Sequence, residues 1–140
     1  MFDNILVPTD LTKNSQKALD IAVKLASNED AAKITLLHVV ETIEGTDDED
    51  FKDFYDRLEK RASQGMEKMA DEFRERGILI DQKILYGNRV REIVKFAFEN
   101  DINLIILSSH RIDEVDSAQG WATISYRVGI LANCPVMMVK

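Results

Sequence analysis

Five short apolar runs are spaced along the chain, and a longer stretch with helical periodicity separates each run from the next. Two of them, NILV after its first residue and LIIL throughout, are apolar without alternation, which is typical of strands buried on both faces of a sheet. Strands that alternate with helices in this way form a parallel sheet with helices on both faces. The expected strands are Asn4–Val7, Lys33–Val40, Ile78–Leu85, Ile102–Leu107 and Val136–Val139.

The four intervening stretches place apolar residues at the i, i+3, i+4, i+7 spacing of an amphipathic helix. We expect Asn14 or Ser15 to cap the first helix, and Gly77 to end the second. Gly65 lies inside the second helix, where it permits a bend or close packing. The apolar positions of the four helices are Ala18, Ile21, Ala22 and Leu25; Phe51, Phe54, Tyr55, Leu58, Ala62, Met66, Met69, Ala70 and Phe73; Val90, Ile93, Val94 and Ala97; and Trp121, Ile124, Val128 and Leu131.

The composition, with 45% hydrophobic and 31% charged residues in 140, is that of one globular domain spanning residues 1–140. No apolar run approaches the ~20 residues of a membrane span, and the first residues do not resemble a signal peptide. A formal net charge of −7 repels nucleic-acid backbones. The single cysteine, Cys134, suits a reducing compartment. We therefore expect a cytoplasmic protein that binds neither nucleic acid nor membrane.

The segment SSHRIDEVDSAQGWAT, Ser108–Thr123, follows the most hydrophobic predicted strand. Beyond the carboxyl end of a strand is where ligands usually bind in a parallel α/β sheet. A phosphate-binding loop there is expected to be rich in glycine, because glycine lets backbone N–H groups close around phosphate. This segment holds one glycine and three acids, Asp113, Glu114 and Asp116. Its residues therefore leave open whether it binds phosphate.

Several motifs, in order along nearly the whole chain, have counterparts in one known family. NILVPTDLTKNSQKALDIAVKLA resembles the first strand, Pro-x-Asp turn and first helix of the universal stress protein family, and ITLLHVVE is similar to that family's second strand. GNRVREIVKFA is similar to the third loop and helix, and INLIILSSH and YRVGILANCPVMMVK to the fourth strand, last helix and closing strand. The resemblance implies an adenine-nucleotide-hydrolase-like α/β fold. That fold is a single doubly wound, Rossmann-like domain whose five parallel strands have the order 3-2-1-4-5.

The resemblance also implies a homodimer, because members of the family commonly pair their last strands. Here that strand would be Val136, Met137, Met138 and Val139. A strand at the edge of a sheet exposes unpaired backbone groups, and pairing with a second copy covers them. The alternative is an edge strand that is shielded by a helix.

In family members that bind ATP, the loop after the fourth strand reads Gly-x-x-Gly, nine residues, then Gly-Ser or Gly-Thr. In this chain Ser108, Arg111 and Ala122 take the places of the three glycines, and Thr123 keeps the hydroxyl position. Ser108 and Ala122 are small enough to be tolerated where φ is negative. The Arg111 guanidinium can bind phosphate in place of the backbone N–H groups of a glycine-rich loop, but the acids in the loop repel a triphosphate.

The adenosine half of the implied site is better retained. Pro8, Thr9 and Asp10 match the family's first-strand turn, and Val39 matches a strand-end position near the base. Asp10 has an equally good local role, which is to cap the turn or the first helix. The remaining candidate contacts are His110 and Ile124, which adjoin Arg111 and Thr123 in the sequence.

The other chemically notable residues fit structural roles. His38 lies mid-strand among leucines and valines, so we expect it in or near the core with its hydrogen bonds satisfied. Cys134 is expected to be a packing residue. The acids near His110 match no metal-binding spacing, and no nucleophile–base–orienter set can be assembled. We expect neither a metal site nor a catalytic site.

Two functional hypotheses follow. The first is a dimeric regulatory or interaction module with an unidentified protein partner, weak or absent ATP binding and no catalysis of its own. The second is a retained pocket for an adenine nucleotide, either ATP, with slow hydrolysis, or AMP, whose smaller charge suits the acidic loop better.

Overall fold

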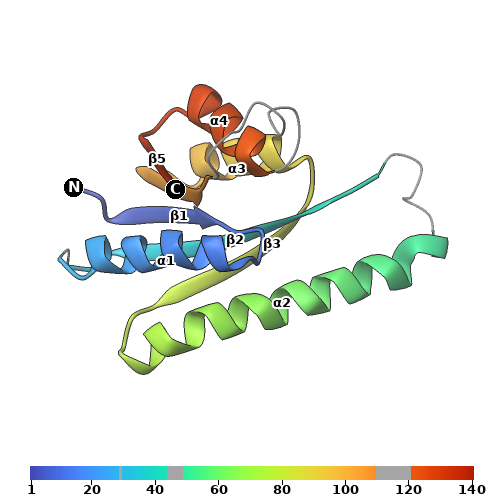
Figure 1. Ribbon diagram of the computed structural model, residues 1–140, viewed down its shortest axis with the longest axis horizontal. Coiled ribbons are helices and arrows are strands. Elements are labelled where there is room, and N and C mark those ends of the chain that lie inside the picture. Colours follow the sequence, from blue (N-terminus) through green and yellow to red (C-terminus); the bar gives the residue numbers. More distant parts are fainter. Residues whose placement is uncertain (29, 44–48, 110–120) are drawn as a thin grey trace.

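A parallel sheet of five strands with the order β3-β2-β1-β4-β5 runs through the centre of the protein (Figure 1). The computed structural model describes residues 1–28, 30–43, 49–109 and 121–140. The strands are β1 (Asn4–Pro8), β2 (Lys33–Glu41), β3 (Ile80–Gly87), β4 (Leu104–Ser108) and β5 (Val136–Val139). The helices are α1 (Lys13–Ala26), α2 (Lys52–Glu75), α3 (Arg89–Glu99) and α4 (Trp121–Leu131), with a short 3-10 turn, η1 (Glu49–Phe51), before α2. The predicted fold class and strand order are confirmed.

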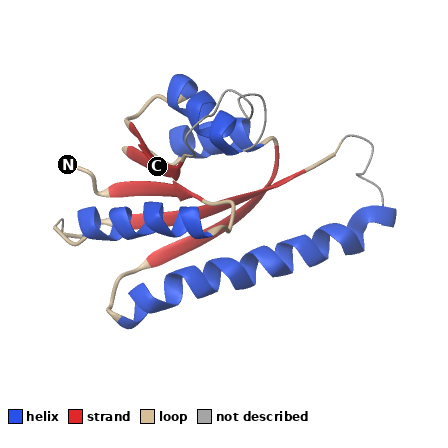
Figure 2. Cartoon of the chain, viewed as in Figure 1, coloured by secondary structure: helices blue, strands red, loops and turns tan. Residues whose placement is uncertain are grey.

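The helices cover the two faces of the sheet in pairs, α1 with α2 on one face and α3 with α4 on the other (Figure 2). Successive strand residues point to opposite faces, so β1 contributes Ile5 and Val7 to one core and Leu6 to the other. In β4 every residue is buried, as the unbroken apolar run predicts. The structure is therefore a three-layer α/β/α domain with two hydrophobic cores.

Two predicted strands begin later than the sequence pattern suggests, because the residues before them complete a helix end. The Ile78 N–H donates to the Phe73 carbonyl at 3.1 Å, and Gly77 has a φ of +83°, so the chain is still leaving α2. The Ile102 N–H likewise donates to the Ala97 carbonyl of α3 at 3.0 Å. Gly77 ends the second helix as predicted.

The predicted cap of the first helix is wrong. Helix α1 starts at Lys13 and its N-cap is Thr12, whose side chain makes no capping hydrogen bond. The hydroxyl of Ser15 points back to Asp10 instead of capping the helix. The Asp10 carboxylate, two residues before the N-cap, accepts hydrogen bonds from the Thr12 N–H and the Ser15 hydroxyl and so fixes the start of the helix.

Gly65 within α2 lies beside the turn that follows β1. A Cβ built at Gly65 would lie 3.4 Å from Leu11 Cδ2, which is an ordinary van der Waals distance, so this contact does not require glycine.

None of the described helices is both long and apolar enough to cross a membrane.

The turn between β3 and α3 requires glycine. Gly87 has a φ of +140°, and a Cβ there would lie 3.1 Å from Glu92 Oε1 and 3.2 Å from Glu92 Cγ. The next residue, Asn88, is the N-cap of α3, and its side chain accepts a hydrogen bond from the Arg91 N–H at 3.0 Å. This turn sets where α3 begins.

We expect Gly87→Ala to lower the free energy of unfolding by about 1–3 kcal/mol, because alanine must adopt an unfavourable φ and displace the Glu92 side chain. Urea denaturation monitored by circular dichroism measures the change. The matched control is Gly129→Ala on the exposed face of α4, where nothing lies within 4 Å of the added Cβ. That variant should gain up to about 1 kcal/mol from helix propensity. Equal effects at the two glycines would contradict the strained turn.

Candidate functional site

The sheet has its topological switch point between β1 and β4. After β1 the chain crosses to β2 on one side, whereas after β4 it crosses to β5 on the other. Ligands of open α/β sheets bind in the crevice outside the carboxyl ends of the strands at this point. The structure places Pro8, Thr9 and Asp10 at the end of β1, and Ser108 and Ser109 at the end of the adjacent β4. The sequence-predicted residues on both strands therefore meet at one place.

Thr9 is buried and held by hydrogen bonds through its backbone and its side chain. Its N–H donates to the Leu37 carbonyl at 2.8 Å, and its carbonyl faces Nδ1 of His38 at 2.9 Å. Its hydroxyl accepts the Leu11 N–H at 2.9 Å and lies 3.6 Å from the sulfur of Met69. The Thr9 hydroxyl therefore makes its contacts with groups of the protein itself.

Asp10 organises the turn that leads into α1. Its Oδ1 accepts hydrogen bonds from the Thr12 N–H at 3.0 Å, the Thr12 hydroxyl at 2.6 Å and the Ser15 hydroxyl at 2.6 Å. Ser15 Oγ in turn accepts the Asp10 N–H at 3.2 Å. Burial of the carboxyl opposes ionisation, but the hydrogen bonds outweigh it and hold the Asp10 pKa below its ordinary value. The predicted local role of Asp10 is confirmed.

Leu11 adopts an unfavourable backbone conformation in this turn. It has a φ of +68°, which is unusual for a residue with a branched side chain. Its side chain is half-buried and packs against Gly65 of α2 and the core beneath α1. The turn keeps this backbone conformation because the bonds of Thr9 and Asp10 and the packing of Leu11 all support it.

His38 links β2 to the turn, which confirms the prediction of a satisfied residue near the core. A carbonyl oxygen only accepts hydrogen bonds, so Nδ1 carries the proton that is donated to Thr9. Burial disfavours the charged ring and lowers the His38 pKa from 6.5. The bond to Thr9 and the charge of Asp10 oppose this shift, whereas Arg89 adds to it. The native state therefore prefers neutral His38.

The end of β4 carries two buried serines in different environments. Ser109 donates its N–H to the Val139 carbonyl at 2.7 Å, and its hydroxyl accepts a hydrogen bond from Ser125 of α4 at 3.1 Å. The Ser108 side chain is 1% exposed, and its Oγ has no hydrogen-bond partner among the described residues. Ser108 is not among the described residues with positive φ, so a side chain is compatible with its backbone.

The remaining predicted contacts lie on β2, on α4 and in the segment between β4 and α4. Val39 is 4% exposed and belongs to the core beneath α3 and α4. Ile124 is half-buried against the same core. Ala122 and Thr123 lie in the first turn of α4. His110 and Arg111 lie outside the described residues, as do Asp113, Glu114 and Asp116.

Within the described ranges, no group of three or more His, Cys, Asp or Glu side chains is arranged to hold a metal ion. Cys134 is half-buried against the α3/α4 core, and burial raises the pKa of its thiol. A thiol with a raised pKa is a weak nucleophile, which agrees with the predicted packing role.

Comparison with known proteins identifies the family. The sequence profile of the Universal stress protein family matches residues 1–140. The chain belongs to the universal stress protein family. Universal stress protein YxiE of Bacillus subtilis is 29% identical, and the match covers 100% of both chains.

Solved structures of the family share this fold. The structure of MJ0577 from Methanocaldococcus jannaschii is 27% identical, covers 100% of this chain and 96% of its own, and has a TM-score of 0.84. A universal stress protein from Archaeoglobus fulgidus in complex with dAMP is 21% identical, covers 100% of both chains and has a TM-score of 0.71. At this lower identity the likeness shows the fold alone.

Sequence analysis of this family member missed the Ser109–Ser125 hydroxyl pair and the glycine turn before α3. The two serines are 16 positions apart, and only the packing of α4 on β4 brings them together. The glycine turn had a readable signal, because Gly87 and Asn88 lie between a strand pattern and a helical pattern.

The buried neutral His38 predicts a pH-dependent stability. Its folded pKa lies below 6.5, so the unfolded chain takes up the proton first as the pH falls. Its contribution to stability is complete above that value and decreases below it. We expect the urea midpoint of the wild type to decrease more between about pH 8 and about pH 5 than that of His38→Asn, which keeps a donor and does not titrate. The only other histidine, His110, is present in both proteins, so the difference isolates His38. Identical pH profiles would contradict the assignment.

Proposed function

We propose that this protein is a non-catalytic stress-response module of the universal stress protein family. In this proposal it acts in the cytoplasm as a homodimer, regulates through an unidentified protein partner, and binds ATP weakly or not at all. The observation that carries the proposal is that the polar groups of the switch-point turn are already bonded within the chain. The proposed role in the stress response rests on membership of the universal stress protein family.

One oxygen of the Asp10 carboxylate, Oδ1, is poorly placed to accept bonds from a nucleoside. Each carboxylate oxygen offers about two lone-pair sites, and three donors already converge on Oδ1. A ribose hydroxyl or adenine amino group at this oxygen must compete with Thr12 or Ser15. Losing those bonds would also release the start of α1 and the turn that holds Leu11. Binding at Oδ1 is therefore coupled to a structural cost.

The negative charge of the protein makes binding of a triphosphate still less favourable. The chain has 25 acids and 18 lysines and arginines, and three of the acids lie between Ser108 and Thr123. Negative potential opposes the approach of a ligand with several negative charges. The glycines that shape a phosphate loop in ATP-binding relatives are replaced at Ser108, Arg111 and Ala122.

A second candidate function, binding of an adenosine monophosphate, is favoured by Ser108. A buried hydroxyl without a partner is destabilising, and a polar ligand atom at the switch point would satisfy it. A monophosphate also brings less negative charge to the acidic loop than ATP does. The A. fulgidus complex with dAMP supports the idea that this fold accommodates such a ligand.

Isothermal titration calorimetry distinguishes the two candidates. We expect no micromolar binding of Mg-ATP, and a micromolar dissociation constant for Mg-ATP at this site would contradict the main proposal. If AMP binds, Ser108→Ala should weaken AMP binding by about fivefold, the loss of one hydrogen bond of about 1 kcal/mol. Binding of AMP without an effect of Ser108→Ala would remove the support for the second candidate.

The proposed dimer rests on the open edge of β5. The carbonyls of Pro135 and Val139 accept from β4 residues, so the alternate residues Val136 and Met138 direct their backbone groups away from β4. No described strand lies beyond β5. The Met137 side chain is 37% exposed at this edge. A second copy pairing with β5 would cover these groups.

Light scattering after size-exclusion chromatography tests the dimer. The wild type should have twice the chain mass of 16.0 kDa. Met137→Lys should shift the protein toward the monomer, because it brings like charges together in the paired strands. Leu79→Lys is the control, since Leu79 is 83% exposed and lies before β3 at the opposite edge. A monomeric wild type, or a dimer that Met137→Lys leaves intact, would contradict pairing through β5.

A further inference from the structure

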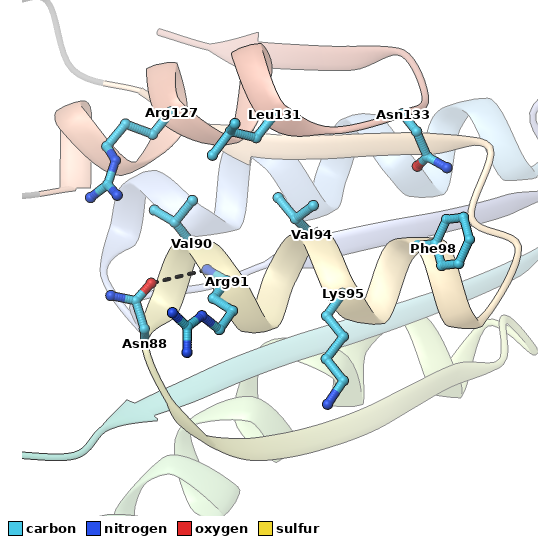
Figure 3. A pocket seen from close by; sticks show the side chains of 9 residues that line it. All are labelled: Asn88, Val90, Arg91, Val94, Lys95, Phe98, Arg127, Leu131 and Asn133. Carbon is cyan, nitrogen blue, oxygen red and sulfur yellow. Dashed lines mark hydrogen bonds between the residues drawn. The ribbon is translucent and has the colours of Figure 1, made fainter.

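A groove of about 630 Å³ lies between α3 and α4, on the face of the sheet opposite α1 and α2 (Figure 3). Its volume is in the range of small-molecule sites. Of the candidate nucleotide contacts whose side chains the structure describes, none lines the groove. Among these residues, the groove and the site of the proposed function share no member.

Three cations line this groove: Arg91 and Lys95 on α3, and Arg127 on α4. None of them has an ion pair or a side-chain hydrogen bond with any residue in the described ranges. Four other basic side chains, Lys33, Arg74, Arg76 and Arg89, pair with acids within 4.0 Å. The described lining contains no Asp or Glu. In a chain of net charge −7, this groove is a local reversal of sign that favours an anion.

The lining changes from cationic to apolar along the groove. Figure 3 shows the Arg91 and Arg127 guanidinium groups at the end where Asn88 begins α3. The helix dipole of α3 adds positive potential at this end. Beyond it, Val90, Val94 and Leu131 line the middle of the groove.

Phe98 lies at the far end of the groove from the guanidinium groups (Figure 3). Its side chain is 68% exposed, and that of Leu131 is 57% exposed, so the groove offers apolar surface that the described chain leaves uncovered. From Arg91 to Phe98 the helix rises about 10 Å, at about 1.5 Å per residue. This distance suits an alkyl chain of medium length.

We propose that this groove binds an amphipathic anion, with a carboxylate or phosphate head group on an unbranched alkyl tail. The head group is held by Arg91 and Arg127, whose planar guanidinium groups suit both kinds of oxyanion. Lys95 adds a third positive charge beside the groove. The tail lies along Val90, Val94 and Leu131 toward Phe98, where it removes apolar surface from water. Neither a free inorganic anion nor a neutral alkyl chain uses both ends of the groove.

Dansylaminoundecanoate, a fluorescent amphipathic anion, is the probe that tests this site. Its emission should rise when it binds the full-length protein, and decanoate or decyl phosphate should displace it. Comparing these two competitors identifies the preferred head group. Decanol should compete at least about tenfold more weakly, because it lacks the charge that the arginines bind. Inorganic phosphate should not compete. No binding of the probe, or equal competition by decanol and both anions, would overturn the proposal.

Substitutions in the groove test whether the amphipathic anion binds there. Arg91→Gln combined with Arg127→Gln should weaken decanoate binding by at least about tenfold while decanol competition stays unchanged. Phe98→Ser should weaken the binding of decanoate and decanol alike, since it shortens the apolar surface. All three side chains are exposed, and thermal unfolding verifies that the variants fold. Arg61→Gln, an exposed cation on α2, is the control. Wild-type affinity in the double variant, or an equal loss in Arg61→Gln, would overturn the assignment.

Discussion

The hydrogen bond from His38 to the Thr9 carbonyl is the contact on which the switch point depends. It fixes the end of β1 against β2, and the bonds of Asp10 then set the direction in which the chain enters α1. Leu11, held at positive φ, completes the turn by packing against Gly65 of α2. One short turn thus joins two strands and two helices. The bonds that His38 and Ser15 donate are partly buried, so breaking either would leave a polar group poorly satisfied, whereas the Thr12 bond to Asp10 is exposed to water.

The same turn explains why the fold holds together without a nucleotide. The two cores are apolar and do not depend on a ligand, and the turn closes on its own hydrogen bonds. Ser108 ends a regular strand and does not have positive φ, so a serine costs the backbone nothing at that position. Its buried hydroxyl has no described partner, which is the reason to consider a monophosphate ligand. Opposite this turn, across the sheet, the groove between α3 and α4 offers a different kind of recognition, by charge at one end and apolar surface at the other.

Hydrophobic periodicity predicted the strands, the helices and the position of His38 near the core, because it reports on burial, whereas the strand order was predicted from the family resemblance. Strand starts at Ile80 and Leu104 were predicted too early, since apolar residues that finish a helix look like residues that begin a strand. The cap of α1 was missed because the helix already begins at Lys13 and Ser15 turns its hydroxyl toward Asp10. The assignment of Val39 to the base rests on the resemblance and stays a prediction. The α3/α4 groove could not be read from sequence, because it depends on how two helices separated by β4 align.

The hydrogen bonds of the switch-point turn are complete without a nucleotide. Amide hydrogen exchange of Leu11 and Thr12, followed by nuclear magnetic resonance with and without Mg-ATP, measures whether this is so in solution. These two N–H groups donate to the Thr9 hydroxyl and to the Asp10 carboxylate. We expect both amides to be protected in the free protein and Mg-ATP to leave their exchange rates unchanged. Rapid exchange in the free protein that Mg-ATP slows would contradict this expectation.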